Sequence, residues 1–147
     1  FRHNFDKQAT FLKLFDVANP QECYRRSESI TPQQALALFN SNICVTGGRR
    51  LARKMLERSP DDDAESRTRF VHAAFERVLS RPPSEEELTE CLEYLDEQTS
   101  LLSAPGALTA LESADAPTVA PSGSAAVRAR ENLLIVLFNH VDFVTIR

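Results

Sequence analysis

Apolar residues recur every three or four positions in several stretches of the chain, and no stretch alternates strictly as a strand does. The first stretch follows Thr31, which as N-cap forms a capping box with Gln34, while Pro32 suits the first helical position. A helix is predicted to begin at Pro32 and to end at Gly47-Gly48, because glycine readily adopts the left-handed conformation that follows a helix. Its apolar face comprises Ala35, Leu36, Leu38, Phe39 and Ile43.

Three further helices are predicted before residue 103. A short surface helix ends at Pro60, and its apolar side comprises Leu51, Ala52, Met55 and Leu56. The acidic run 61–63 suits the start of the next helix, whose inward stripe comprises Phe70, Val71, Ala74, Phe75, Val78 and Leu79. After Pro82-Pro83, Ser84 and Glu87 form a second capping box. The inward positions of that helix are Leu88, Cys91, Leu92, Leu95 and Leu102. The short proline turn predicts an antiparallel pair.

The rest of the chain completes an all-α fold. Residues 103–124 are mostly Ala, Ser, Pro and Gly, which predicts a mobile loop because they bury too little apolar surface to offset ordering. Helical spacing then returns at Ala126, Ala129, Leu133, Val136 and Leu137. The run 133–138 alone also fits a buried strand, but the length favours a helix. The tail from Val141 is expected to be extended, and residues 1–31 are expected to form an irregular arm. The prediction is one domain, 1–147, an irregular bundle of about five helices.

Length and net charge limit the classes of protein to which this chain can belong. The 147 residues suit a single domain with a modest core. A formal net charge of −4 argues against a general nucleic-acid binder, which needs excess Lys and Arg to contact phosphates. The longest apolar run is far shorter than the roughly 20 residues that cross a bilayer, so no membrane span is expected. Because the chain opens on Phe1, with neither Met nor a signal-like segment, we expect a processed product or an excised piece of a longer polypeptide.

Candidate catalytic and metal-binding residues are sparse. The cysteines have no C-x-x-C spacing, and Cys44 and Cys91 are predicted to be buried as small apolar residues, while Cys23 lies in a loop. The three histidines lie far apart, so no metal site is predicted. His140 and Asp142 have the residue types of a general-base pair, although such a pairing in a tail is more often incidental. No nucleophile motif or phosphate-binding loop occurs. The acidic run 61–63 is interpreted as helix capping and not as a cation site, and the run 85–87 as first-turn residues that complement the helix dipole.

One group of basic residues is a candidate anion-binding patch: Arg49, Arg50, Arg53, Lys54 and Arg58. Such side chains suit a phosphate, a sulfated polysaccharide or an acidic protein face. The favoured alternative is a solvated helix face that forms salt bridges with neighbouring Glu residues.

Three segments carry a family signal: LFDVANPQECYRRSESITPQQALALFNS, AFERVLSRPPSEEEL and LFNHVDFVTIR. Together they resemble an uncharacterised C-terminal domain family of planctomycete multidomain proteins. The matching positions of the first segment are Phe15, Asp16, Asn19, Pro20, Arg25, Arg26, Thr31, Pro32, Gln34, Ala35, Leu36 and Asn40. In the closing segment Asp142 stands where the family has an acidic residue, whereas His140 and Val141 depart from its usual pattern.

The resemblance implies the end of a long exported protein, hence an extracytoplasmic location. Upstream regions in that family often include a cytochrome c-like domain with C-x-x-C-H, so c-type haem is expected there, and no cofactor is expected in this chain. The resemblance also implies that five residues act together: Asp16, Arg25, Arg26, Gln34 and Asn40. We expect a structural network in which Arg25 or Arg26 bridges Asp16 and loop carbonyls.

Three functions stay open on the sequence alone. The favoured one is a non-catalytic interaction or scaffolding domain that docks on upstream domains of its own polypeptide, or on a polysaccharide or another exported protein. A second is that Asp16, Arg25, Arg26 and Asn40 contribute to a catalytic or carbohydrate-binding site that upstream domains complete. A third is that the basic residues 49–58 form a docking surface for an acidic redox protein.

Overall fold

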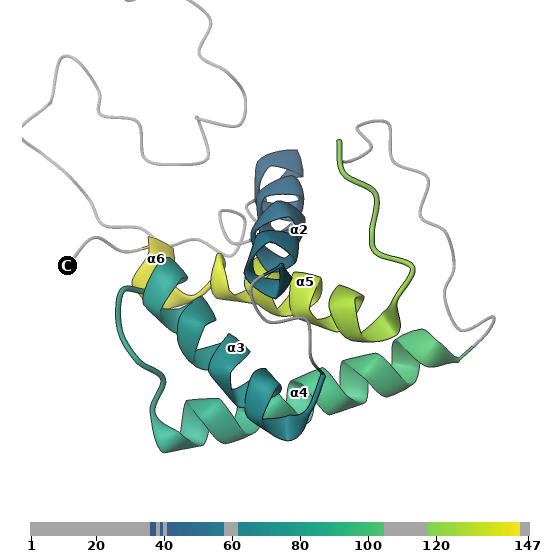
Figure 1. Cartoon of the computed structure of the whole chain (residues 1–147). Coiled ribbons are helices and arrows are strands. Elements are labelled where there is room, and N and C mark those ends of the chain that lie inside the picture. The colour runs from purple at the N-terminus through teal and green to yellow at the C-terminus, as the bar shows by residue number, and fades with distance from the viewer. Residues whose placement is uncertain (1–35, 38, 40, 58–61, 105–117, 145–147) are drawn as a thin grey trace, which may run out of the picture.

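The computed structural model describes residues 36–37, 39, 41–57, 62–104 and 118–144 (Figure 1). All regular structure within these ranges is helical, which confirms the predicted all-α class. The helices are α2 (Asn42–Leu56), α3 (Ala64–Val78), α4 (Glu85–Ser103), α5 (Ala125–Leu137) and α6 (Val141–Val144). None of these helices is long and apolar enough to span a membrane. The predicted arm, residues 1–31, lies outside the described residues.

Helix α5 lies at the centre of the domain and contacts α2, α3 and α4 (Figure 1). Its residues 129–131 and 133–135 are all buried. Because successive residues of a helix point about 100° apart, three consecutive buried residues require neighbours around much of the helix. The apolar run 133–138 is therefore a buried helix with its C-terminal turn, and the strand alternative is excluded.

The hydrophobic core forms where these four helices meet. Its buried members are Ala52, Met55, Phe70, Val71, Ala74, Phe75, Val78, Leu95, Ala129, Leu133, Leu134 and Leu137. Helix α4 contributes one fully buried side chain, Leu95, and covers the core edge with partly buried residues such as Leu88 and Leu92.

Helix α2 continues through Gly47 and Gly48, so the prediction that these glycines end one helix and precede another is wrong. The helix begins after Ser41, whose hydroxyl accepts a hydrogen bond from the Cys44 N–H at 3.1 Å. The helix start predicted at Pro32 lies outside the described residues.

Gly48 allows α2 and α5 to approach closely. A Cβ atom at this position would lie 2.8 Å from Ile135 Cγ1, well inside normal carbon–carbon contact. The absence of a side chain at Gly48 therefore sets the contact between the two helices, and the left-handed conformation is not needed there.

Helices α3 and α4 match their sequence patterns. The Asp63 carboxylate caps α3 by accepting from the Ser66 N–H at 2.7 Å, and the predicted stripe is buried except for the partly buried Leu79. Ser84 and Glu87 form the predicted capping box of α4. The acidic residue before α3 thus acts as a cap, as the sequence indicated.

Contacts between α3 and α4 run in antiparallel order. Arg67, in the first turns of α3, pairs with Asp96 in the second half of α4. Arg81, just after α3, pairs with Glu87 in the first turn of α4. The predicted antiparallel pair is therefore confirmed.

Residues 118–122, called the strap here, lie alongside α2 (Figure 1). The Thr118 N–H donates to Asn42 Oδ1 at 3.3 Å, and further bonds to α2 are described below. The strap belongs to the segment 103–124, for which a mobile loop was predicted. Residues 105–117 of that segment lie outside the described residues, so the mobility of the loop stays a prediction.

The C-terminal tail is not extended over residues 141–144, where it forms the short helix α6. Its first turn is stabilised by the Phe143 N–H, which donates to the His140 carbonyl at 2.9 Å. The Phe143 ring packs against Phe138 with centroids 5.1 Å apart, so apolar contact holds the tail against the end of α5.

Candidate functional site

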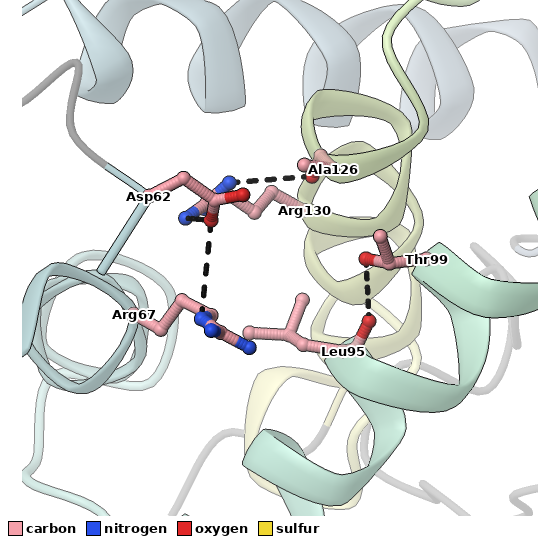
Figure 2. Close-up of a pocket in the computed structure, with 6 residues that line it drawn as sticks. All are labelled: Asp62, Arg67, Leu95, Thr99, Ala126 and Arg130. Carbon is pink, nitrogen blue, oxygen red and sulfur yellow. Dashed lines mark hydrogen bonds and ion pairs between the residues drawn. The ribbon is translucent and has the colours of Figure 1, made fainter. Parts of the chain in front are cut away.

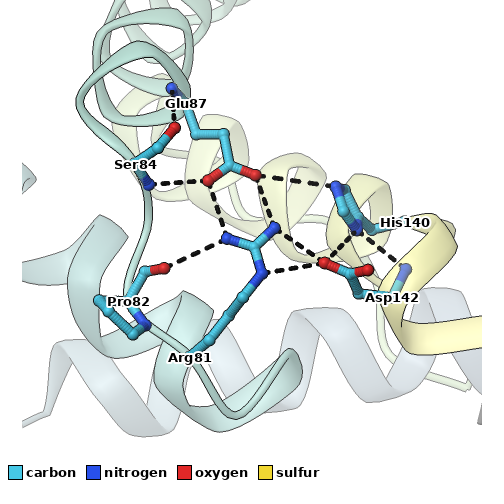
Figure 3. A network of polar contacts seen from close by, with 6 residues as sticks. All are labelled: Arg81, Pro82, Ser84, Glu87, His140 and Asp142. Atoms are coloured by element: carbon cyan, nitrogen blue, oxygen red, sulfur yellow. Dashed lines mark hydrogen bonds and ion pairs between the residues drawn. The ribbon is translucent and has the colours of Figure 1, made fainter. Parts of the chain in front are cut away.

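Arg81 lies where the turn after α3, the first turn of α4 and the C-terminal residues meet (Figure 3). Its Nη1 and Nη2 donate to the two carboxylate oxygens of Glu87 at 2.8 and 2.6 Å. Its Nε donates to Asp142 Oδ2 at 2.9 Å, and the guanidinium carbon lies 5.5 Å from the centre of the Phe75 ring. Arg81, Glu87, His140 and Asp142 are called the Arg81 junction below.

The electrostatics of the Arg81 junction favour the charged forms of its ion pairs. Hydrogen bonds from Arg81 hold the pKa of the Glu87 carboxyl at about 2, below its ordinary value of 4.5, and the Ser84 N–H adds to this effect. The hydrogen bonds to Glu87, and to a smaller extent those to Asp142, raise the pKa of the Arg81 guanidinium. The ion pairs of the junction therefore connect the turn after α3, the first turn of α4 and the C-terminal residues.

His140 and Asp142 do not have the geometry of a general-base pair. In such a pair the carboxylate accepts the Nδ1 proton of the imidazole. Here His140 Nδ1 accepts a hydrogen bond from the backbone N–H of Asp142 at 3.1 Å, while the Asp142 carboxylate lies 3.7 Å from that nitrogen and bonds to Arg81. The imidazole thus caps the start of α6.

A second polar cluster surrounds Glu131 in the middle of α5. The residue is 0% exposed, and its carboxylate accepts from Arg53 Nε at 2.8 Å and from the Ser122 N–H at 3.1 Å. Arg49 Nε lies 4.0 Å from the same carboxylate. These four residues, called the Glu131 cluster, join α2, α5 and the strap.

The same two arginines also hold the strap by its backbone. Arg49 Nη1 donates to the Val119 carbonyl and Arg53 Nη2 to the Ala120 carbonyl, each at 2.6 Å. Burial lowers the pKa of the Arg49 guanidinium, and the nearby Glu131 charge opposes that effect. The cluster therefore neutralises a buried carboxylate and satisfies loop carbonyls together.

The predicted anion-binding patch divides in two. Arg49 and Arg53 turn toward Glu131 and the strap, whereas Arg50 and Lys54 are exposed. Arg58 lies outside the described residues. Whether an anion binds here stays a prediction, and the exposed part that the structure describes consists of Arg50 and Lys54.

A cavity of about 140 Å³ opens between α3, α4 and α5 (Figure 2). It is lined by Asp62, Arg67, Leu95, Thr99, Ala126 and Arg130. The Arg130 guanidinium is almost fully buried, donates to Asp62 Oδ1 at 2.6 Å and lies over the Phe70 ring at 5.6 Å. Two guanidinium groups, a carboxylate and a hydroxyl thus share one small space.

The cysteines differ in burial. Cys44 is buried as predicted, and Cys91 is partly buried, which raises the pKa of its thiol to about 11 and keeps it protonated. Cys23 lies outside the described residues. Among the residues with described positions, no three His, Cys, Asp or Glu side chains group together as metal ligands.

The five family-motif candidates lie outside the described residues: Asp16, Arg25, Arg26, Gln34 and Asn40. The sequence reasoning also missed Arg130 and Glu131, which are among the most buried polar residues. The sequence did indicate that Arg130 is buried, because Arg130 follows Ala126 by four positions and therefore falls on the predicted apolar face of its helix.

A comparison with known families gives a match over most of the chain. Residues 2–95 match the model of the PSD1 family, described as a protein of unknown function (DUF1553). The chain belongs to the PSD1 family. The PSD1 match includes the first two segments of the resemblance, together with the arginine pair and the Arg-Pro-Pro turn, and ends within α4. It does not extend to the closing segment around Asp142. No curated protein and no solved structure matches the chain.

Proposed function

We propose that this PSD1 domain is a non-catalytic interaction domain that docks on other domains of a longer polypeptide. The observation that carries the proposal is a set of large apolar side chains left in contact with solvent near the start of α2 and the C-terminal tail. Ile43 is 79% exposed and Phe143 is 44% exposed, and Phe39 is exposed as well. Large apolar side chains that are exposed close to one another are typical of surfaces that contact another protein.

Two of the exposed residues, Ile43 and Phe143, lie near the partly buried ring of Phe138. Ile43 is one helical turn before Gly47 and shares its face. A Cβ at Gly47 would lie 3.8 Å from Phe138 Cε2, and the Phe138 ring packs on Phe143. Ile43, Phe138 and Phe143 are therefore called the apolar surface.

The charged clusters support a structural rather than a chemical use of this domain. The Arg81 junction and the Glu131 cluster each connect segments that are far apart in sequence, and each pairs opposite charges at hydrogen-bonding distance. Such pairs fix the relative positions of helices, which gives a docking surface a defined shape.

The test is to express the remainder of the longer polypeptide separately and to measure its affinity for this chain by isothermal titration calorimetry. Ile43→Ser is expected to weaken binding at least about tenfold, because a buried apolar contact at the centre of an interface contributes that much or more. Leu101→Ser is the matched control, since Leu101 is also exposed but lies at the far end of α4. The absence of binding, or an equal loss in both variants, would contradict the proposal.

The family resemblance supports two further parts of this proposal. The longer polypeptide is exported to an extracytoplasmic location, and its preceding domains carry c-type haem. Cell fractionation and the visible absorption spectrum of the full-length protein test these statements. A cytoplasmic, colourless full-length protein would reject both while leaving the docking proposal open to the calorimetric test.

A further inference from the structure

We propose that the cavity between α3, α4 and α5 binds a small oxyanion, a carboxylate or an inorganic phosphate, between Arg67 and Arg130 (Figure 2). The two guanidinium groups reach the cavity from α3 and α5, and Thr99 lines it from α4. A guanidinium is the side chain best suited to planar recognition of carboxylate and phosphate oxygens.

The cavity has room for such a group. Its volume of about 140 Å³ compares with the roughly 30 Å³ that one water molecule occupies in the liquid, so it holds an ion of several heavy atoms. The lining is mixed: Leu95 and Ala126 form apolar wall, while the polar groups of Arg67, Thr99 and Arg130 share the same space.

Hydrogen-bond donors in the lining lack acceptors. Arg130 is 3% exposed, and its Nε is buried without a hydrogen-bond partner among the described residues. Arg67 Nε is in the same condition, since its nearest carboxylate oxygen, Asp62 Oδ1, lies 3.9 Å away. Buried charged donors without acceptors are unfavourable, and two of them around one cavity indicate a ligand that supplies oxygen atoms.

The Thr99 hydroxyl donates its proton to the Leu95 carbonyl at 2.7 Å, so that proton is already engaged and the two arginines are the donors left for an oxyanion. The hydroxyl is thereby fixed in the cavity wall, and its position is set by α4.

The Asp62 carboxylate would compete with a bound oxyanion for Arg130. Its Oδ1 bonds to Arg130 Nη2 at 2.6 Å, yet 51% of the Asp62 side chain is exposed. Asp96, on α4, pairs with the other arginine, Arg67. An incoming oxyanion would replace the Asp62 carboxylate, which turns to solvent, so the total charge around the arginines stays balanced.

The experiment follows the arginine Nε–Hε signals of the whole chain by ¹H–¹⁵N NMR. Sodium phosphate and sodium acetate are titrated separately against sodium chloride at equal ionic strength. Saturable shifts of the Arg67 and Arg130 Nε–Hε signals are expected with at least one of the two oxyanions. The phosphate and acetate arms distinguish a phosphate ligand from a carboxylate ligand.

Three variants test the proposal, because a different direction of change in oxyanion affinity is expected for each. Arg67→Lys removes the Nε–H while keeping the charge, and is expected to weaken binding about tenfold or more. Asp62→Asn removes the competing carboxylate and is expected to strengthen binding. Arg69→Lys is the matched control on the same helix, because Arg69 pairs with Glu65 and does not line the cavity.

Two outcomes overturn the proposal. One is that phosphate and acetate shift these signals no more than chloride does, which means the cavity holds water only. The other is binding that Asp62→Asn fails to strengthen and that Arg67→Lys and Arg69→Lys reduce equally, which means nonspecific attraction to surface arginines. Asp62→Asn keeps an Oδ1 acceptor for Arg130 Nη2 at a half-exposed position, so this variant is expected to fold and keeps the test decisive even if Arg67→Lys is unstable.

Discussion

Gly47 and Gly48 are adjacent residues of the same helix, but only one of them is in close contact with α5. A Cβ at Gly48 would meet Ile135 Cγ1 at 2.8 Å and the Ile135 backbone nitrogen at 3.4 Å. A Cβ at Gly47 would meet Phe138 Cε2 at 3.8 Å, which is ordinary contact. A substitution at Gly47 therefore reports mainly the low helix propensity of glycine. A substitution at Gly48 also reports the close contact between α2 and α5.

Alanine at these two positions is expected to have opposite effects on stability. Gly47→Ala should stabilise the domain by up to about 1 kcal/mol, because alanine restricts the unfolded chain and favours the helix. Gly48→Ala should destabilise it by about 1–3 kcal/mol, since the added methyl group overpacks the contact with α5. Chemical denaturation of both variants measures the difference, and equal effects would show that α2 and α5 adjust freely.

At the scale of elements, the start of α4 is stabilised by both local and distant contacts. The capping box between Ser84 and Glu87 is local, and it satisfies backbone N–H groups of the first turn. The bidentate pairing of Glu87 with Arg81 adds a charge-assisted contact from the preceding turn. A single carboxylate thus fixes the helix start and the direction in which α4 leaves the turn.

Stability is expected to fall in acid through Glu87. The pKa of this carboxyl is about 2 in the folded domain, below its ordinary 4.5. Its contribution is therefore fully present above about pH 4.5 and is lost as the pH falls toward 2. Glu87→Gln should cost about 1–3 kcal/mol at pH 7 and should reduce the loss of stability between pH 4.5 and 2.

Urea unfolding at several pH values measures this dependence. Glu86→Gln is the control, because Glu86 is an exposed neighbour in the same first turn. If Glu86→Gln and Glu87→Gln change the pH profile equally, the effect belongs to the net charge of the turn and not to the pair with Arg81.

At the scale of the whole molecule, α5 organises the fold because the other long helices pack around it. Arg130 and Glu131 lie on buried faces of α5, at 3% and 0% exposure, so their charges must find partners in other elements. They do so in opposite directions: Arg130 pairs with Asp62 before α3, and Glu131 pairs with Arg53 of α2. The Ser122 N–H adds the strap to the second pair.

Glu131→Gln is expected to destabilise the domain by about 3–5 kcal/mol, because it leaves the arginines beside it without their counter-charge. The strap should loosen in the same variant, which hydrogen exchange of the Ser122 amide measures. Glu76→Gln, an exposed position on α3, is the control and should stay within about 0.5 kcal/mol of the unsubstituted chain. An unchanged denaturation midpoint for Glu131→Gln would show that the cluster contributes nothing to stability.

The sequence by itself determined what depends on neighbours within one or two helical turns. The caps at Asp63 and Ser84, the inward stripe of α3 and the short proline turn follow from local hydrogen bonds and from the 3.6-residue period, so they were predictable. The family-motif residues before position 41 were recognised from the sequence, and their arrangement remains a prediction.

Only the tertiary structure decided what depends on partners far away in the chain. Gly48 was misread because glycine suits both a helix end and a close helix crossing, and only the position of Ile135 distinguishes the two. The partners of Arg130 and Glu131 lie 68 and 78 residues away, at Asp62 and Arg53. A periodic pattern shows which face of a helix is buried, but it contains no information about which charge another element places against that face.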